Sequence, residues 1–214
     1  EVTIGAIEKA LTNNPRGDHR HTLQHCQMAE EAHFRKMSNL GICVNLFANH
    51  IYYWGDQHIK HTIGPDRAAR MNATATAKRY GVNFSIHSDA PVTPLAPLFT
   101  AWCAVHRRTA SGRILGEHER LSVDDALRAI TLGAAYTLKL DHLIGSIESG
   151  KYADFAVLEE DPYHVDQDRL KDIGIWGTVV DGTPFGEDDD ACNGFKRVMI
   201  NPVIFESSSE QSIM

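Results

Sequence analysis

The sequence predicts an α/β fold built on a parallel sheet, followed by a small β-rich segment. Across residues 4–138 of the 214-residue chain, short apolar stretches alternate with helical patterns in the order β-α-β-α-β. One of these stretches, 42–48 (ICVNLFA), is almost unbroken apolar sequence, as a strand covered by helices on both faces requires. Beyond residue 142 the helical period disappears, and short strands with Gly-containing turns replace it.

The elements are placed in order by their start and stop signals. Gly41 and Gly81 end two helical patterns, and Pro65 with Asp66 begins the second of them. Ser122 is an N-cap ahead of the most regular helical pattern in the chain. In chain order we expect a helix end at 4–12, a strand at 20–26, a helix at 29–41, a strand at 42–48, a helix at 64–81, a strand at 82–86, helices at 97–108 and 121–138, and strands within 145–158 and 175–185.

This order divides the chain into three parts. Residues 1–142 form the parallel α/β unit, and residues 143–186 form a β unit with turns at Ser149-Gly150 and Asp181-Gly182. Residues 187–214 begin with a charged run and end in a serine-rich stretch, so we expect a partly disordered tail in which 198–205 adds an edge strand.

Composition excludes several classes of function. The net charge of -7, with acids and bases interspersed, does not suit a nucleic-acid surface, and no apolar run is long enough to cross a membrane. The four cysteines lack CxxC spacing, which argues against a disulfide framework and a thiolate zinc site and favours a reducing, cytoplasmic location. Because the chain opens on Glu1 rather than Met, we expect that it lacks its true start.

Two strand ends carry the residues that indicate chemistry. In the third strand, period-two alternation places His87 and Asp89 on the polar face, opposite Phe84 and Ile86. In the first strand the same alternation places His25 at the carboxyl end. The two ends therefore offer imidazole and carboxylate to one space, and these are usual ligands of a catalytic Zn²⁺.

Plainer interpretations stand beside this one. A histidine at a strand end is more often a hydrogen-bonded structural residue, and Asp89 before Ala-Pro equally suits an Asx-turn. The stretch 49–61 packs three histidines and three aromatic side chains behind a strand end, where they line a pocket or simply cover the rim. Six other histidines are expected on the solvated surface: His19, His33, His106, His118, His142 and His164.

Four segments together resemble the carboxyl-terminal half of the metal-dependent amidohydrolase superfamily, in its branch related to N-substituted formamide deformylase. They are RHTLQHCQMAEEAHFRKMSNLGICVNLF, IHSDAPVTPLAPLFTAW, LSVDDALRAITLGAAYTLKLDHLIGSIESGKYADFAVLEEDP and GTVVDGTPF. The resemblance covers residues 1 to 186. It implies that residues 1–142 are the last part of a (β/α)8 TIM barrel and that residues 143–186 belong to a small β-sandwich. It also implies that His25 and Asp89 match the metal-binding residues at the ends of the sixth and eighth barrel strands.

By the same resemblance, the activity is hydrolysis of a non-peptide carbon–nitrogen bond by water that a divalent metal activates, with Asp89 as the general base. The metal would be zinc, as one or two ions. His50, Tyr53, Trp54 and His87 are expected to contact a small amide-like substrate.

The family's HxH pair on the first barrel strand, its bridging ligand and its fifth-strand histidine have no counterpart here. We therefore expect the chain to be a carboxyl-terminal fragment whose activity depends on the amino-terminal half of the same polypeptide. A homodimer is a further expectation. An inactive binding or assembly module that keeps the amidohydrolase fold is the alternative, and a phosphate-handling barrel is disfavoured because no Gly-rich phosphate loop is present.

Overall fold

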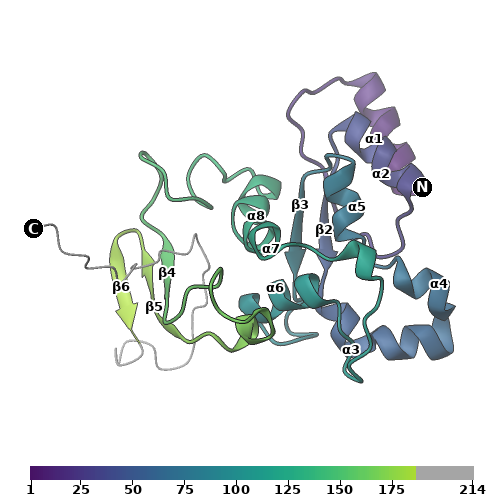
Figure 1. Cartoon of the computed structure of the whole chain (residues 1–214). Helices are drawn as coiled ribbons and strands as arrows, with labels where there is room; N and C mark the ends of the chain where they lie inside the picture. Colours follow the sequence, from purple (N-terminus) through teal and green to yellow (C-terminus); the bar gives the residue numbers. More distant parts are fainter. Residues whose placement is uncertain (187–214) are drawn as a thin grey trace, which may run out of the picture.

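The computed structural model describes residues 1–186, which form a mixed α/β structure with two separate sheets (Figure 1). The predicted α/β class is therefore confirmed. In chain order the elements are α1 (Val2–Asn13), β1 (Thr22–His25), α2 (Glu31–Leu40), β2 (Cys43–Phe47), α3 (Asn49–Gln57), a π-helical segment η1 (His58–Thr62), α4 (Gly64–Ala69), α5 (Thr74–Arg79), β3 (Phe84–His87), α6 (Pro97–His106), η2 (Glu117–Glu119), α7 (Val123–Ile130), α8 (Leu132–Thr137), β4 (Phe155–Leu158), η3 (Gln167–Asp172), β5 (Ile175–Val180) and β6 (Thr183–Gly186).

The first sheet is parallel in the order β1-β2-β3, as the alternation of elements predicts. Its central strand is buried at four of five positions. The register aligns Gln24 with Asn45 and Asn45 with Ser85. Asn45 Nδ2 donates to Gln24 Oε1 at 2.9 Å, and Ser85 Oγ donates to Asn45 Oδ1 at 2.9 Å. A polar row therefore crosses one face of the sheet.

The core lies on the other face, between the sheet and its helices. α2 contributes Phe34 and Met37, which are fully buried, and α7 contributes Leu127. Both α7 and α8 contact β3, and Figure 1 shows them between the two sheets. The apolar positions predicted at helical spacing thus face the sheet, and burial of each large side chain stabilises the fold by roughly 1.5–3 kcal/mol.

The helix predicted over 64–81 is in fact two helices, α4 and α5. Asn72 lies between them in the left-handed region, with φ 49°, and its backbone N–H donates to the Gln27 carbonyl at 2.8 Å. The buried Arg107 guanidinium donates to the carbonyls of Met71, at 2.8 Å, and Asn72, at 2.9 Å. These tertiary hydrogen bonds hold the backbone groups that a continuous helix would have paired internally.

The helix predicted over 121–138 is also divided, into α7 and α8. Its N-cap is confirmed, because Ser122 Oγ accepts from the Asp125 N–H at 3.1 Å. Thr131 breaks the helix with ψ −94°, and its hydroxyl donates to the Leu127 carbonyl at 2.8 Å. The break turns α8 so that Gly133 approaches β3. A Cβ at Gly133 would lie only 2.4 Å from the Phe84 carbonyl oxygen.

The second sheet is antiparallel, in the order β4-β5-β6. Asp181 and Gly182 join β5 to β6 with φ values of 49° and 77°, as a tight hairpin turn requires. Only Phe155–Leu158 of the predicted 145–158 stretch is a strand. The tail at 187–214, with its predicted edge strand, lies outside the described residues.

The helices of this structure are short. The longest, α1, has 12 residues, whereas about 20 consecutive apolar residues are needed to span a bilayer. Within residues 1–186, every helix is therefore too short or too polar to span a membrane.

Candidate metal centre

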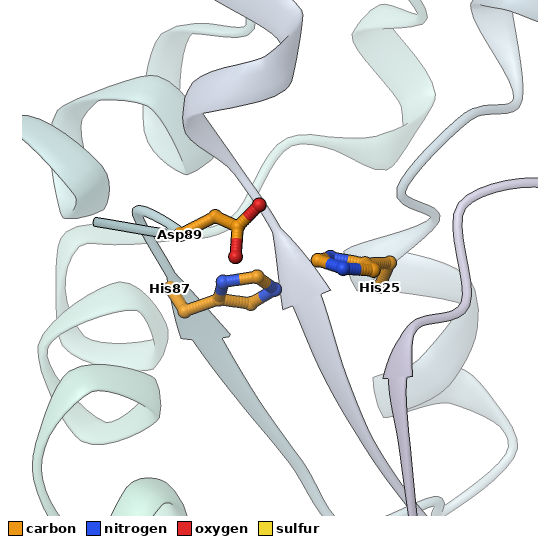
Figure 2. A group of neighbouring side chains, drawn as sticks. All are labelled: His25, His87 and Asp89. Atoms are coloured by element: carbon orange, nitrogen blue, oxygen red, sulfur yellow. The ribbon is translucent and has the colours of Figure 1, made fainter. Parts of the chain in front are cut away.

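The side chains of His25, His87 and Asp89 converge above the carboxyl ends of the parallel strands (Figure 2). One possible ligand atom from each residue lies within 4.8 Å of the other two. The imidazole rings of His25 and His87 have centroids 5.0 Å apart. The spatial meeting of His25 with Asp89, which the strand ends predict, is therefore present in the structure, and His87 joins them.

His25 does not reach this cluster by the alternation that the sequence suggests. The register pairs Leu23 with Val44 and His25 with Leu46. Val44 and Leu46 belong to the buried apolar core. Regular alternation would thus turn His25 toward the helices. Instead, His25 has a left-handed backbone with φ 60°, and Cys26 follows with φ 46°. Because the backbone is not extended here, the His25 side chain does not follow the alternation of the strand.

Asp89 is held by a tight turn just beyond β3. Its φ is 55°, and its carbonyl accepts a hydrogen bond from the Val92 N–H at 2.7 Å. Thr93 then donates to the Ser88 carbonyl and accepts from Asn49 Nδ2 at 2.9 Å, which ties the turn to the start of α3. These hydrogen bonds hold the turn, and the turn fixes the position of the half-buried Asp89 carboxylate.

His87 is the most enclosed member of the cluster. Its Nε2 is buried and has no hydrogen-bond partner among the described residues. Burial, followed by the neighbouring His25 imidazole, lowers the pKa of His87 to about 4, and the Asp89 carboxylate opposes this shift. His87 is consequently neutral at physiological pH, which is the form that binds metals.

Two imidazoles and one carboxylate are a donor set that fits a divalent transition metal, since catalytic zinc sites hold three such ligands and leave one position open. The unpartnered, buried Nε2 of His87 supports this fit, because a buried polar nitrogen without a partner is costly unless something binds it. The sequence predicted His87 only as a substrate contact. Its inclusion among the possible ligands could have been found from its shared face with Asp89.

The other three residues predicted to contact substrate, His50, Tyr53 and Trp54, lie along α3 and divide into two sets. The His50 ring stacks on Phe47 with centroids 4.9 Å apart and makes a T-shaped contact with Trp54 at 5.0 Å. Phe47 in turn stacks on His87 at 5.1 Å. The rings of Phe47, His50 and Trp54 therefore form an aromatic wall beside the cluster. Tyr53 is 40% exposed, and its ring contacts are with Trp54 and two aromatic residues outside this wall, Tyr52 and Phe99.

Two histidines differ from the sequence analysis. His106 was expected on the solvated surface but is buried: its Nε2 lies 2.9 Å from the Gln167 carbonyl, and its Nδ1 lies 3.3 Å from an Asp168 oxygen. His58, unassigned from sequence, contacts His50, and their ring centroids are 4.8 Å apart. Eight residues correspond to about 12 Å of helical rise, so helical spacing gives no signal for this pair.

Comparison with known proteins supplies the evolutionary context. N-substituted formamide deformylase of Arthrobacter pascens is 28% identical over 182 residues, which are 85% of this chain and 33% of that protein. The Bacillus subtilis protein YtcJ is 30% identical over 188 residues, which are 85% of this chain and 34% of that protein. The chain thus spans about one third of the length of these curated relatives.

A solved structure shares the fold. The crystal structure of an uncharacterized metal-dependent hydrolase from Pyrococcus horikoshii matches with a TM-score of 0.64 at 21% identity, covering 78% of this chain and 32% of that one. The sequence model of the amidohydrolase family matches residues 1–185, nearly the whole described region. The chain therefore belongs to the amidohydrolase family.

Proposed function

We propose that the protein containing this chain is a metal-dependent hydrolase that cleaves a non-peptide carbon–nitrogen bond in a small amide-like substrate. The observation that carries this proposal is the convergence of His25, His87 and Asp89 at the strand ends. The name of the Arthrobacter relative, a deformylase of N-substituted formamides, supports the substrate class. Family membership supports the reaction class.

In this proposal His25, His87 and Asp89 hold a divalent cation, most simply zinc, as one or two ions. When bound, such a cation supplies Lewis-acid polarisation of a carbonyl group and makes water more acidic at neutral pH. The neutral His87 imidazole suits a ligand role, since burial holds its pKa at about 4. Its predicted role as a substrate contact is compatible with the same position.

Asp89 acts as the general base. Its carboxylate accepts a proton from the attacking water and later delivers that proton to the leaving nitrogen. The turn that fixes Asp89 through Val92 and Thr93 limits the carboxylate to a narrow range of positions, which favours proton transfer at a defined distance. His50 and Trp54 wall the substrate side, and Tyr53 lies farther along the same helix.

We further propose that the parallel sheet is part of a (β/α)8 barrel and that the antiparallel sheet belongs to a β-sandwich. The parallel order β1-β2-β3 supports the barrel, since its carboxyl ends carry the site as barrel strands do. In the described residues the sheet has three strands, whereas about eight close such a barrel. The remaining strands and ligands would come from the amino-terminal half of the same polypeptide. A homodimer and a cytoplasmic location remain predictions.

Asp89→Asn in the intact protein tests the mechanism. Because the amide cannot accept the proton, turnover of N-substituted formamides and related small amides should fall by about 10²–10⁴-fold. Steady-state kinetics measure the loss, and circular dichroism checks that the fold is unchanged. Asp66→Asn is the matched control, since Asp66 is exposed in the first turn of α4.

Equal turnover in Asp89→Asn and the natural protein would remove Asp89 from the mechanism. A protein that binds no stoichiometric metal and hydrolyses none of these amides would instead support the binding or assembly module.

A further inference from the structure

A second pair of imidazoles lies beside the candidate metal centre. His50 Nε2 and His58 Nε2 are 3.1 Å apart, and Gln27 Nε2 lies 3.4 Å from the same His58 nitrogen. His50 comes from α3, His58 from the π-helical segment η1, and Gln27 from the segment that follows β1. Three elements thus bring three polar side chains to one point.

His58 is held by Thr62. The Thr62 oxygen lies 2.6 Å from His58 Nδ1 and 3.4 Å from the His58 backbone carbonyl oxygen. In the tautomer whose Nδ1–H donates to Thr62, the Nε2 of His58 presents a lone pair toward His50 and Gln27.

Two polar atoms approach one ring nitrogen. The Nε2 of His58 has a single in-plane position, for a lone pair or a hydrogen, yet His50 Nε2 and Gln27 Nε2 both lie within 3.4 Å of it. Only one of the two can make a well-directed hydrogen bond there. Rotating the Gln27 amide by half a turn exchanges its nitrogen for its carbonyl oxygen. Only the hydrogen-bond network decides between these two orientations. The group then offers two ring nitrogens and one oxygen.

The separation suits two ligands of one metal ion. Zn–N bonds of about 2.0–2.1 Å place two tetrahedral nitrogen ligands about 3.3 Å apart, and a right-angle arrangement places them about 2.9 Å apart. The observed 3.1 Å between His50 and His58 lies between these limits. A hydrogen bond from the non-coordinating nitrogen of a metal-binding histidine is also the usual orienting contact, and Thr62 provides it for His58.

We propose that His50, His58 and Gln27 form an auxiliary site for a transition-metal ion such as Zn²⁺, Ni²⁺ or Cu²⁺. Imidazole ligands select these ions over Mg²⁺ and Ca²⁺, which prefer oxygen. The site shares no residue with the His25, His87 and Asp89 cluster. The Phe47 ring links the two, since it stacks on both His50 and His87, so an ion at this site lies beside the substrate wall.

The rings around the pair keep it in place before any ion binds. His50 is held between Phe47, on which it stacks, and Trp54, with which it makes a T-shaped contact. His58 is fixed by Thr62, four residues later in the same π-helical turn, and such turns occur often at functional sites. The site therefore needs only a rotation of the Gln27 amide and the neutral tautomers of His50 and His58 that leave both Nε2 lone pairs free.

The test is zinc titration of the intact protein, measured by calorimetry after removal of metals with a chelator. His25→Ala combined with Asp89→Asn weakens the first centre, and this double variant should still bind one equivalent of Zn²⁺. Adding His58→Ala to the double variant should raise the dissociation constant of zinc more than tenfold. Adding Thr62→Val instead should raise it by about 10–100-fold, because the contact that orients His58 is lost. Adding His61→Ala, an exposed histidine in the same segment, should leave it unchanged.

Equal dissociation constants for the His58→Ala and His61→Ala proteins would overturn the proposal, as would a double variant that binds no zinc. Electron paramagnetic resonance of Cu²⁺ bound to the double variant gives a second measurement: nitrogen coupling from two imidazoles supports the site, and its absence contradicts it. This outcome is separate from that of the hydrolase proposal, which turnover in Asp89→Asn protein with His50 and His58 intact decides.

Discussion

At the scale of single residues, burial governs the charge of the histidines around Phe47. Desolvation, followed by the nearby His58 and His25 imidazoles, lowers the pKa of His50 to about 4, and the Asp89 carboxylate opposes the shift. A low-dielectric surrounding disfavours the charged form of an imidazole. His50 is therefore uncharged at neutral pH, as is His87.

This charge state predicts how stability changes with pH. Between pH 6.5 and 4 the unfolded chain protonates at His50 while the folded protein does not, so the free energy of unfolding falls as pH falls through this window and is unaffected above it. Because His50 is only half-buried, its share is about 1 kcal/mol. Urea denaturation of metal-free protein at pH 7 and pH 4 measures the difference.

The His50→Gln protein should lose less stability on acidification than the natural protein, and the exposed His61→Gln control should match the natural protein. If the His50→Gln protein loses as much stability as the natural protein, His50 does not titrate as its burial implies.

The sequence predicts which residues form the site better than it predicts how their side chains are oriented. His25 and Asp89 stand at strand ends, and strand ends can be read from apolar runs. The left-handed backbone at His25 cannot be read, because no glycine marks it. The burial of His106 likewise depends on η3, which is 61 residues away from it in the sequence at Gln167.

At the scale of elements, close approaches between backbones decide where a helix packs. Gly133 in α8 faces the backbone of β3, and an added methyl group would lie 2.4 Å from the Phe84 carbonyl oxygen. Backbone cannot move aside as the end of a flexible side chain can. α8 therefore packs where it does because residue 133 has no side chain.

Gly133→Ala should lower the free energy of unfolding by about 1–3 kcal/mol, because the methyl group forces α8 away from β3. Gly5→Ala is the matched control: it lies inside α1 with nothing within 4 Å of an added Cβ, so it should be neutral or stabilise by up to about 1 kcal/mol through helix propensity. Chemical denaturation compares the two variants. A Gly133→Ala protein as stable as Gly5→Ala would show that α8 can shift without cost.

The two helix breaks show the limit of periodicity at this scale. The patterns at 64–81 and 121–138 keep a helical repeat throughout, so local sequence favours one helix in each. The first break is held by Arg107 and the second by Thr131, through hydrogen bonds that form only in the folded chain. Tertiary contacts override the local preference in both places.

At the scale of the whole molecule, the parallel sheet has two unlike faces. The helices cover an apolar face, while the opposite face carries the row from Gln24 through Asn45 to Ser85 and, at the strand ends, the candidate ligands. The overall class and the change at residue 142 follow from sequence, since periodicity is a local property.

Binding of a divalent ion should stabilise the molecule as a whole. Zn²⁺ at 100 times its dissociation constant adds about 2.7 kcal/mol to the free energy of unfolding when only the folded state binds it. Differential scanning calorimetry with zinc and with chelator measures the change. The gain should be smaller in a His25→Ala protein, and an equal gain there would place the stabilising ion elsewhere.

The positive φ angles at His25, 60°, and Asp89, 55°, set stability against the proposed chemistry of the site. A left-handed backbone costs a residue with a Cβ about 1–2 kcal/mol, while glycine adopts it freely. Selection for heat resistance alone would accordingly favour glycine at positions 25 and 89, and these substitutions would remove an imidazole and a carboxylate from the site. Thermostabilising libraries of this enzyme family therefore need a functional screen at every round.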